Sequence, residues 1–227
     1  MATATAAFER PRTTQEHVLA ELRRRILTGE VRPGEPIRPD AVAAELRVSR
    51  VPVREALRIL EGEGAVEYRA HHGYTLASLR LADLEEIYRI RRLLESEAAR
   101  EAVARLSAED LTTMRAASGE MEALGPSDAD RAAMSVANRR FHMTLLEACG
   151  MPHLLRHIRL LWDASDHYRS VYYLDDDHRR EVHDDHRAIA EAAVAADPDA
   201  LVSALDDHRR HAIDGLRTAL EEDDTHE

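Results

Sequence analysis

Two short amphipathic segments, separated by only a few residues, constrain the fold of this chain more than any other feature. The first covers residues 41–46 and the second covers residues 49–64. Ser49 can cap the second helix, Pro52 is tolerated in its first turn, and Gly64 ends it. The apolar residues of the second segment recur at helical spacing: Val53, Ala56, Leu57 and Leu60. The spacing therefore predicts two helices joined by a tight turn.

The flanking segments complete a known supersecondary unit. Thr13 and Glu16 form a capping-box pattern that opens a helix, and Gly29 ends that helix. Residues 31–39 form a turn-rich connector. The stretch AVEYRAHHGYTLA places β-forming residues on both sides of a His-His-Gly tip, which predicts a small hairpin. A helix, a short helix, a turn, a second helix and a hairpin predict a winged helix-turn-helix.

The second helix of such a motif lies in the DNA major groove, so its exposed face carries the predicted function. Arg50 and Arg54 lie one helical turn apart on one face, and Arg58 continues that face. A guanidinium can donate to O6 and N7 of guanine together, which makes arginine the commonest reader of that base. The alternative is a solvated arginine face on an ordinary amphipathic helix. The cap, the preceding helix and the hairpin favour a DNA-reading helix.

The charge of the chain is divided unevenly. The 227 residues carry a formal net charge of −12, but residues 1–80 contain 13 Arg against 11 acidic residues, whereas residues 81–227 contain 18 Arg against 32. Every basic residue is an arginine, which we attribute to a GC-biased coding style before attributing it to function. The asymmetry predicts two domains that have different partners.

The sequence also predicts the compartment. Cys149 is the only cysteine, which excludes an internal disulfide and is typical of a reducing cytoplasm. No stretch approaches the roughly 18 consecutive apolar residues of a membrane-spanning helix. The N-terminal residues lack the apolar centre of a signal peptide. We therefore expect a cytoplasmic protein without a membrane partner.

From residue 81 the pattern changes to long amphipathic helices. The segment 81–106 is amphipathic for about seven turns. A cap at residues 107–110 opens a helix that runs to Leu124, and Gly125-Pro126 breaks it. Further helices are predicted at roughly 128–148, 152–172, 179–195 and 199–221. The expected fold class is mainly α: a winged helix-turn-helix at residues 10–78 and an all-helical bundle at residues 80–222.

Ten of the 13 histidines follow residue 80, and helical phase selects three of them. Asn138 and His142 are four residues apart and share one face of their helix. His186 and His208 lie on the apolar stripes of two other helices and therefore point inward. A lone histidine is more often an ordinary surface or core residue. Three inward histidines and an amide from three helices, however, predict a site for Zn, Ni, Cu or Fe.

The same phase analysis places three further polar residues. His183 and His211 share faces with charged residues, so both are expected to point outward. Arg91 lies on the apolar stripe of its helix, where an unpaired charge is unfavourable. Arg91 could clamp a carboxylate ligand. The alternative for Arg91 is a salt bridge with an acidic residue of another helix.

The stretch AVAAELRVSRVPVREALRILEGEGAVEYRAHHGYTLAS resembles the N-terminal domain of the GntR family of bacterial transcription regulators, whose pattern is LA..LGVSRTPVREAL..L...G. The resemblance covers about residues 14–78. It implies that Ser49, Arg50 and Arg54 contact DNA and that His72-Gly73 form the wing tip, which enters the minor groove. Two residues depart from the pattern: Arg47 stands at the usual turn glycine, and Val51 replaces the usual threonine.

Residues 80–220 resemble the FCD domain, the helical effector module of the FadR branch of this family. The segments that carry the resemblance are EIYRIRRLLESEAAREA, NRRFHMTLLEACG, HRAIAEAA and LDDHRRH. In that family an Asp and three His bind a divalent metal, which can ligate a small carboxylate. The matching positions are Asn138, His142, His186 and His208, and Asn138 departs from the common aspartate.

The sequence therefore predicts a DNA-binding transcription regulator, a homodimer that acts as a repressor on a short palindromic operator. A small carboxylate effector, bound with a Zn or Ni ion and anchored by Arg91, would control DNA binding. A regulator that senses the metal itself is the alternative. A metalloenzyme is a third reading, because three histidines with open positions also describe a catalytic zinc site. The sequence has no HExxH-type motif and carries a DNA reader, which argues against an enzyme.

Overall fold

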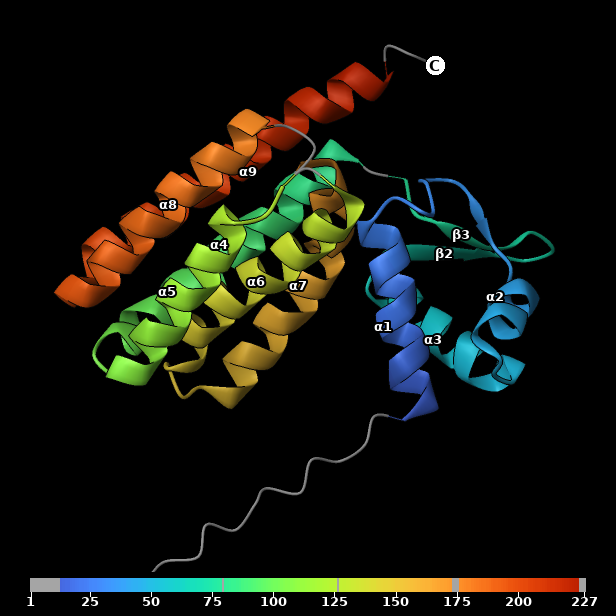
Figure 1. The fold of residues 1–227 in the computed structure, drawn as a ribbon, viewed down its shortest axis with the longest axis horizontal. Helices are drawn as coiled ribbons and strands as arrows, with labels where there is room; N and C mark the ends of the chain where they lie inside the picture. Colours follow the sequence, from blue (N-terminus) through green and yellow to red (C-terminus); the bar gives the residue numbers. More distant parts are fainter. Residues whose placement is uncertain (1–12, 79, 126, 173–175, 225–227) are drawn as a thin grey trace, which may run out of the picture.

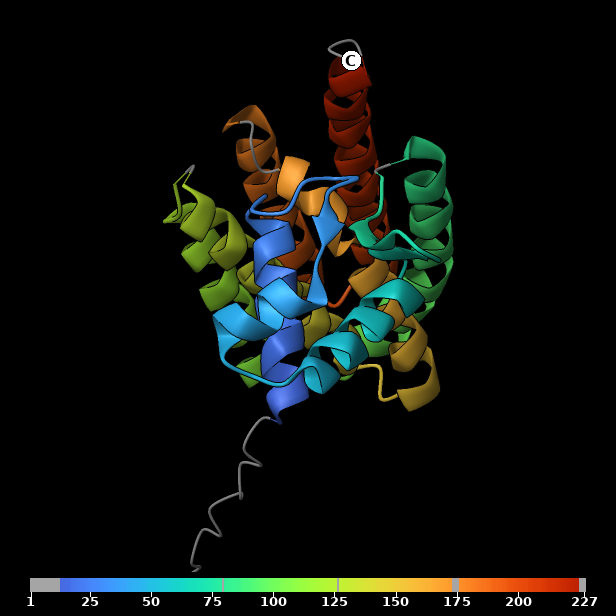
Figure 2. The same ribbon diagram turned by 90° about the vertical axis from the view of Figure 1, so that its right-hand side faces the viewer.

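The computed structural model describes residues 13–78, 80–125, 127–172 and 176–224, and it confirms the expected fold class. A small domain of helices and a three-stranded sheet lies beside a larger domain of long helices (Figure 1). In the perpendicular view the small domain lies in front of the helical domain (Figure 2). Residues 10–12 of the predicted first domain lie outside the described residues. None of the helices in the described ranges has both the length and the apolar character needed to cross a membrane.

The N-terminal domain follows the predicted order of elements, with one addition. Its elements are α1 (Thr14–Leu27), β1 (Pro36–Ile37), α2 (Pro39–Leu46), α3 (Arg50–Gly62), β2 (Val66–Arg69) and β3 (Gly73–Leu76). The addition is β1, which lies in the predicted connector and pairs antiparallel with β3, so the strand order is β1-β3-β2. Ile37 pairs with Tyr74, and Val66 pairs with Leu76. The short strand therefore ties the segment before α2 to the wing formed by β2 and β3.

The turn between α2 and α3 has an unusual backbone. Arg47 ends α2 with φ 54° and ψ 42°, in the left-handed region that favours glycine. Ser49 occupies the predicted cap position of α3, but its side chain makes no capping hydrogen bond. The predicted capping box of α1 is present: the Glu16 N–H donates to the Thr13 hydroxyl, and the Thr13 N–H donates to the Glu16 carboxylate. The Ser49 hydroxyl is thus not used to close its own helix.

The C-terminal domain consists of long helices: α4 (Leu81–Val103), α5 (Ala108–Glu122), α6 (Asp128–Glu147), α7 (Pro152–Tyr172), α8 (Asp176–Ala195) and α9 (Pro198–Asp224). Their boundaries differ from the predicted ones by a few residues. The predicted cap of α5 is confirmed, because Ser107 and Asp110 form a capping box. Long helices at these positions place residues that are distant in the sequence on neighbouring faces.

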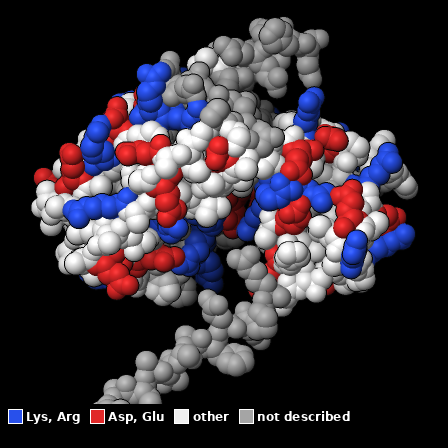
Figure 3. Space-filling view, viewed as in Figure 1, with Lys and Arg blue, Asp and Glu red and all other residues white. Residues whose placement is uncertain are grey.

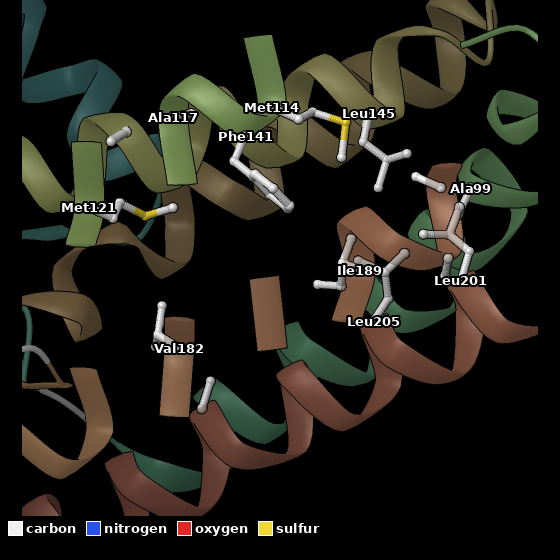
Figure 4. Close-up of a cluster of buried hydrophobic side chains, with 14 of the residues drawn as sticks. Ala99, Met114, Ala117, Met121, Phe141, Leu145, Val182, Ile189, Leu201 and Leu205 are labelled. Carbon is white, nitrogen blue, oxygen red and sulfur yellow. The ribbon is translucent and has the colours of Figure 1, made fainter. Parts of the chain in front are cut away.

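The larger core of the helical domain lies where α5 and α6 face α8 and α9. The side chains of Met114 and Phe141 point toward those of Ile189 and Leu205 across this space (Figure 4). Burying an apolar side chain of this size contributes about 1.5–3 kcal/mol. The core therefore fixes the helices, and with them the polar side chains that lie between them.

A smaller core joins α4, the end of α6 and α7. It contains Ala98, Ala102, Leu146, Ile158 and Trp162. Cys149 is fully buried in the same cluster, and its Sγ accepts a hydrogen bond from the Met151 N–H at 3.4 Å. This core brings Trp162 and the chain that follows it against the polar interior of the domain.

Candidate DNA-reading face and histidine pocket

The exposed face of α3 carries the side chains that were predicted to contact DNA. Ser49, Arg50 and Arg54 are all exposed, and 71% of the Arg50 side chain is accessible. Val51, one of the two departures from the family pattern, is also exposed. The opposite face of α3 is buried through the four predicted residues: Val53, Ala56, Leu57 and Leu60. A packed inner face and an exposed arginine face suit a helix that enters a DNA groove.

Asp40 of α2 lies beside this face and contacts it, although no sequence pattern predicts this contact. Its Oδ1 lies 2.6 Å from Nε of Arg50, and both side chains are largely exposed. By contrast, Arg54 and Arg58 form no ion pair with the residues that the structure describes. The sequence does not mark Asp40 as functional, because carboxylates are common in the first turn of any helix. Only the fold shows that Asp40 contacts Arg50.

The predicted wing tip lies between β2 and β3. His72 is exposed, and its N–H donates to the Arg69 carbonyl oxygen at 3.0 Å. Gly73 begins β3 with φ 84°, and His71 is also left-handed at φ 68°. The tip is therefore a tight turn that projects His72 from the sheet. That His72 and Gly73 contact DNA remains a prediction.

Three histidines from three helices converge in the helical domain. His142 of α6, His186 of α8 and His208 of α9 each offer one ligand atom, and these atoms all lie within 4.8 Å of one another. Nε2 of His142 is 3.0 Å from Nε2 of His186. The ring of His208 stacks on that of His142, with 4.9 Å between the centroids. The structure thus brings together the three histidines that helical phase selected.

Asn138, the fourth predicted ligand, lies one turn before His142 on α6. Its side chain is buried, and its Oδ1 has no hydrogen-bond partner among the described residues. Leaving a buried carbonyl oxygen unpaired is unfavourable by about 1–3 kcal/mol. A cation held beside the oxygen would satisfy it. The orphaned oxygen is therefore the kind of group that a metal site requires.

Asp185 of α8 also belongs to the pocket, although helical phase does not predict it. Its carboxylate lies 3.2 Å from Nδ1 of His208 and 3.0 Å from Nδ1 of His211. Such a contact at one ring nitrogen leaves the other nitrogen of His208 available to a metal. The expectation that His211 points outward is wrong, because α9 turns this side chain toward α8 and Asp185. Phase on a single helix cannot show which side chains of a neighbouring helix lie within reach.

His183 also differs from its predicted position. It is half-buried rather than outward, and its Nδ1 has no hydrogen-bond partner among the described residues. Burial lowers the pKa of this imidazole. The side chain remains outside the group of three converging histidines. Its partial burial follows from the packing of α5 on α8, which the sequence of α8 alone does not show.

Two of the converging histidines, His186 and His208, are electrically neutral near pH 7 because their pKa values are lowered. Burial lowers the pKa of His186 well below its ordinary value of 6.5. Burial also lowers the pKa of His208; contact with Asp185 opposes this change but does not outweigh it. A metal needs neutral imidazole ligands. Two nitrogens bound to one ion at about 2.1 Å each can be separated by the 3.0 Å found between His142 and His186. The residues present therefore fit a divalent metal.

Arg91 lies beside this pocket, but it already has a carboxylate partner. Its Nε lies 2.7 Å from Oε1 of Glu95, one turn along α4, and its Nη1 donates to the Ser165 hydroxyl at 3.1 Å. Glu95 also accepts from Trp162 and, at 2.8 Å, from Arg209 of α9. Burial alone would raise the pKa of Glu95, but the two arginines outweigh it and hold that pKa below its ordinary value. The expected salt bridge exists, although its acid lies on the same helix.

The helix α7 connects the pocket with the DNA-binding domain. Trp162 lies 5.1 Å from the His142 ring, centroid to centroid. The next residue, Asp163, faces the other way and lies 3.4 Å from Arg23 of α1. Arg23 also pairs at 2.7 Å with Glu63, the residue that caps the end of α3. Basic and acidic side chains lie side by side at this junction of the two domains (Figure 3).

Comparison with known proteins identifies both domains. Residues 14–76 match the family described as bacterial regulatory proteins, gntR family, and residues 86–211 match the FCD domain. The HTH-type transcriptional regulator YdhC of Bacillus subtilis is 28% identical over 202 residues, which are 89% of this chain and 90% of YdhC. The transcriptional repressor GlaR of Escherichia coli is 26% identical, over 78% of this chain and 83% of GlaR.

A solved structure shows the same fold. Escherichia coli McbR/YncC superposes with a TM-score of 0.80 at 24% identity, covering 91% of this chain and 98% of that protein. The family and these relatives are transcription regulators, not enzymes. The arginine face of α3, the wing and the helical bundle are thus the parts of a DNA-binding transcription regulator, and the chain belongs to the GntR family, with an FCD domain at its C-terminal side.

Proposed function

We propose that this regulator represses transcription by binding a palindromic operator as a homodimer, and that a small carboxylate bound with a metal ion controls the binding. The observation that carries this proposal is the convergence of His142, His186 and His208 within 4.8 Å, from three different helices. Two buried imidazoles and a half-buried third lie this close together, an arrangement that a ligand using their lone pairs would stabilise. The pocket belongs to a DNA-binding chain, so its occupant acts as a signal.

On the DNA side, Ser49, Arg50 and Arg54 contact base edges in the major groove, and His72 and Gly73 approach the minor groove. Their exposure on α3 and at the wing tip supports this assignment. A two-fold dimer would place two such helices about one DNA turn apart, roughly 34 Å. Exposed Leu93 and Leu160 on the adjacent helices α4 and α7 support an apolar contact between two copies.

On the effector side, Asn138, His142, His186 and His208 hold the metal, which is Zn or Ni. A bound divalent ion supplies positive charge to which a carboxylate can bind. Asp185 orients His208 through Nδ1. Arg91 and Arg209 lie close enough to lower the pKa of His208, whereas the nearer Asp185 raises it. The charge of the metal favours an anionic effector, and Arg91, which pairs with Glu95 in this structure, would anchor its carboxylate within the protein.

Effector occupancy reaches DNA through α7. Trp162 and Ser165 contact the pocket side, whereas Asp163 contacts Arg23 of the N-terminal domain. A ligand that repacks Trp162 would move Asp163, because both lie on the same helical turn. Arg23 would carry this shift to Glu63 at the end of the reading helix. The ligand controls the equilibrium only if it binds the two arrangements with different affinities.

The metal is tested by elemental analysis of untagged protein. We expect His142→Ala, His186→Ala and His208→Ala each to remove most of the bound metal. His157→Ala is the matched control, because His157 is exposed on α7 and lies outside the cluster. It should retain the wild-type metal content. Equal metal in all four variants would refute the site.

The effector and its alternative are separated by operator titrations, with DNA first selected from a randomised duplex pool. If the proposal holds, metal-loaded protein binds this DNA, and one member of a panel of small mono- and dicarboxylates releases it. If metal alone releases the operator and no carboxylate adds to the effect, the chain is a metal sensor. Binding to DNA should also weaken steeply between about 50 and 200 mM salt, because arginine contacts release counterions from phosphates.

A further inference from the structure

The ion pair between Asp40 and Arg50 has no structural purpose that the fold makes evident. Nε of Arg50 lies 2.6 Å from Oδ1 of Asp40, and the two side chains are 71% and 64% exposed. Exposed pairs of this kind add little to folding stability, because water screens them. Asp40 also puts a negative charge on the face that approaches phosphates, which weakens DNA binding in general. An acid at this position therefore opposes affinity unless it contributes something else.

We propose that Asp40 is a specificity-determining residue that holds Arg50 in the orientation that reads guanine. A guanidinium has five N–H donors in a rigid fork. When the carboxylate is paired with Nε, the end of the fork, where the two Nη groups each present an N–H, stays open. These groups can meet O6 and N7 of one guanine together. The inference rests on the proposed role of Arg50 as a base reader.

The contrast with Arg54 sharpens the proposal. Arg54 is exposed on the same face one turn later, but it forms no ion pair within the described part of the chain. A free arginine side chain samples many rotamers and can reach either a base or a phosphate. The held side chain of Arg50 loses less freedom on binding and tolerates fewer partners. Arg50 therefore reads the most strictly specified base pair of each half-site.

The pair should also become stronger when DNA binds. Removal of water from the interface lowers the effective dielectric constant around Asp40 and Arg50. If the base opposite Arg50 is not guanine, the arginine must leave the carboxylate to find another acceptor, and Asp40 then faces the groove unpaired. A wrong base is thus penalised at the same position where the right base is bound. The pair therefore lowers the affinity for DNA in general and raises the preference for guanine over the other bases.

Selection from a pool of duplexes with a randomised central stretch tests the proposal. Wild type, Asp40→Asn, Asp40→Ala and the control Glu61→Gln are each used for selection, and affinities are measured for selected and random DNA. Glu61 is an exposed carboxylate in the last turn of α3, so the control removes the same charge from the same domain. We expect the two Asp40 variants to lose up to about tenfold of the discrimination at one guanine and to bind random DNA more tightly. The control should retain the wild-type base preference.

The double variant Asp40→Ala with Arg50→Ala completes the test. If Asp40 acts through Arg50, the Asp40 change has no further effect on base preference once Arg50 is absent. An unchanged motif in Asp40→Asn and Asp40→Ala would overturn the inference while leaving the DNA-reading function intact. An equal gain of affinity for every sequence would also overturn it, since Asp40 would then be a repulsive charge alone. Failure of the wild type to select any motif would instead refute the proposed function.

Discussion

The two domains use arginine in opposite ways. On α3, Arg50 and Arg54 are exposed beside a packed inner face. In the helical domain the side chains of Arg91 and Arg209 are only 4% exposed, and both bind the buried carboxylate of Glu95. Exposed guanidiniums remain available to a polyanion, whereas buried ones are committed to a network whose disruption leaves a charge without a partner. Arginine loss should therefore reduce DNA binding in one domain and folding stability in the other.

The largest effect is expected at Arg91. Arg91→Ala removes one of two guanidiniums from Glu95 and leaves the Ser165 hydroxyl without its donor. Breaking a buried ion pair from one side lowers the free energy of unfolding by about 3–5 kcal/mol. Denaturant unfolding of the full chain measures this loss of unfolding free energy. Arg54→Ala, the exposed counterpart, should stay within about 0.5 kcal/mol of wild type. Equal losses of unfolding free energy in Arg91→Ala and Arg54→Ala would contradict the difference between buried and exposed arginines.

The next effect concerns DNA. Arg50→Ala removes a bidentate base contact, so specific binding should weaken by about 1–3 kcal/mol. The unfolding free energy should not change, because the Arg50 side chain lies on the surface. Fluorescence anisotropy with selected and random duplexes measures the ratio of specific to non-specific affinity. A parallel loss on both duplexes would make Arg50 a phosphate contact instead of a base reader.

Acid should destabilise the helical domain through its histidines when a chelator keeps metal away. Burial lowers the pKa of His186 well below 6.5, so unfolding takes up a proton when the pH lies below about 6.5 and above the folded-state pKa. Stability therefore falls as the pH falls through this window, by up to about 1.4 kcal/mol per pH unit for one histidine. The expected result for His186→Gln is a shallower slope between about pH 6.5 and 5. An identical slope in wild type and His186→Gln would contradict the lowered pKa of His186.

The smallest effect comes from two turns that share a positive φ and have different surroundings. Arg47 and Ala196 both have positive φ, at 54° and 53°. Glycine removes the steric penalty of this region, so Arg47→Gly and Ala196→Gly should each raise stability by about 1 kcal/mol. Ala195→Gly, within the last turn of α8, should instead lower it by about 1 kcal/mol.

DNA binding separates the two turns. Arg47 is exposed at the turn before the reading helix, so its loss should weaken binding and reduce the salt slope by about one unit. Ala196 lies between α8 and α9, and Ala196→Gly should leave the salt dependence unchanged. If Arg47→Gly also leaves it unchanged, the arginine is a strained replacement of glycine without a DNA contact.

The sequence predicted most of the fold because its signals are local. Apolar spacing, capping boxes and breakers lie within a few residues of one another, and they locate α3 and its buried face correctly. The two-residue strand β1 carries too few residues for a pattern, and only pairing with β3 reveals it. Ser49 has the right residue type for a cap, but sequence does not fix the rotamer that would make the bond.

The pocket was predictable only in part, for a physical reason. Helical phase gives the side of a helix on which His142, His186 and His208 lie, and inward residues meet wherever helices pack. Phase does not identify partners on other helices. Glu95 and Arg209 are 114 positions apart, and no spacing rule links them. Asp185 stands next to His186, yet it contacts α9. Contacts between helices depend on crossing geometry, which is set by the whole core.

The buried thiol makes the smaller core of the helical domain observable on its own. Cys149 is the single cysteine of the chain and is fully buried between α6 and α7. A thiol-reactive dye can modify it only when that corner opens, so the labelling rate reports the frequency of this local opening. The N-terminal domain contains no thiol and is silent in such a measurement. Labelling rates measured with and without DNA or metal would therefore show how each ligand changes the opening of this corner, without a contribution from the rest of the molecule.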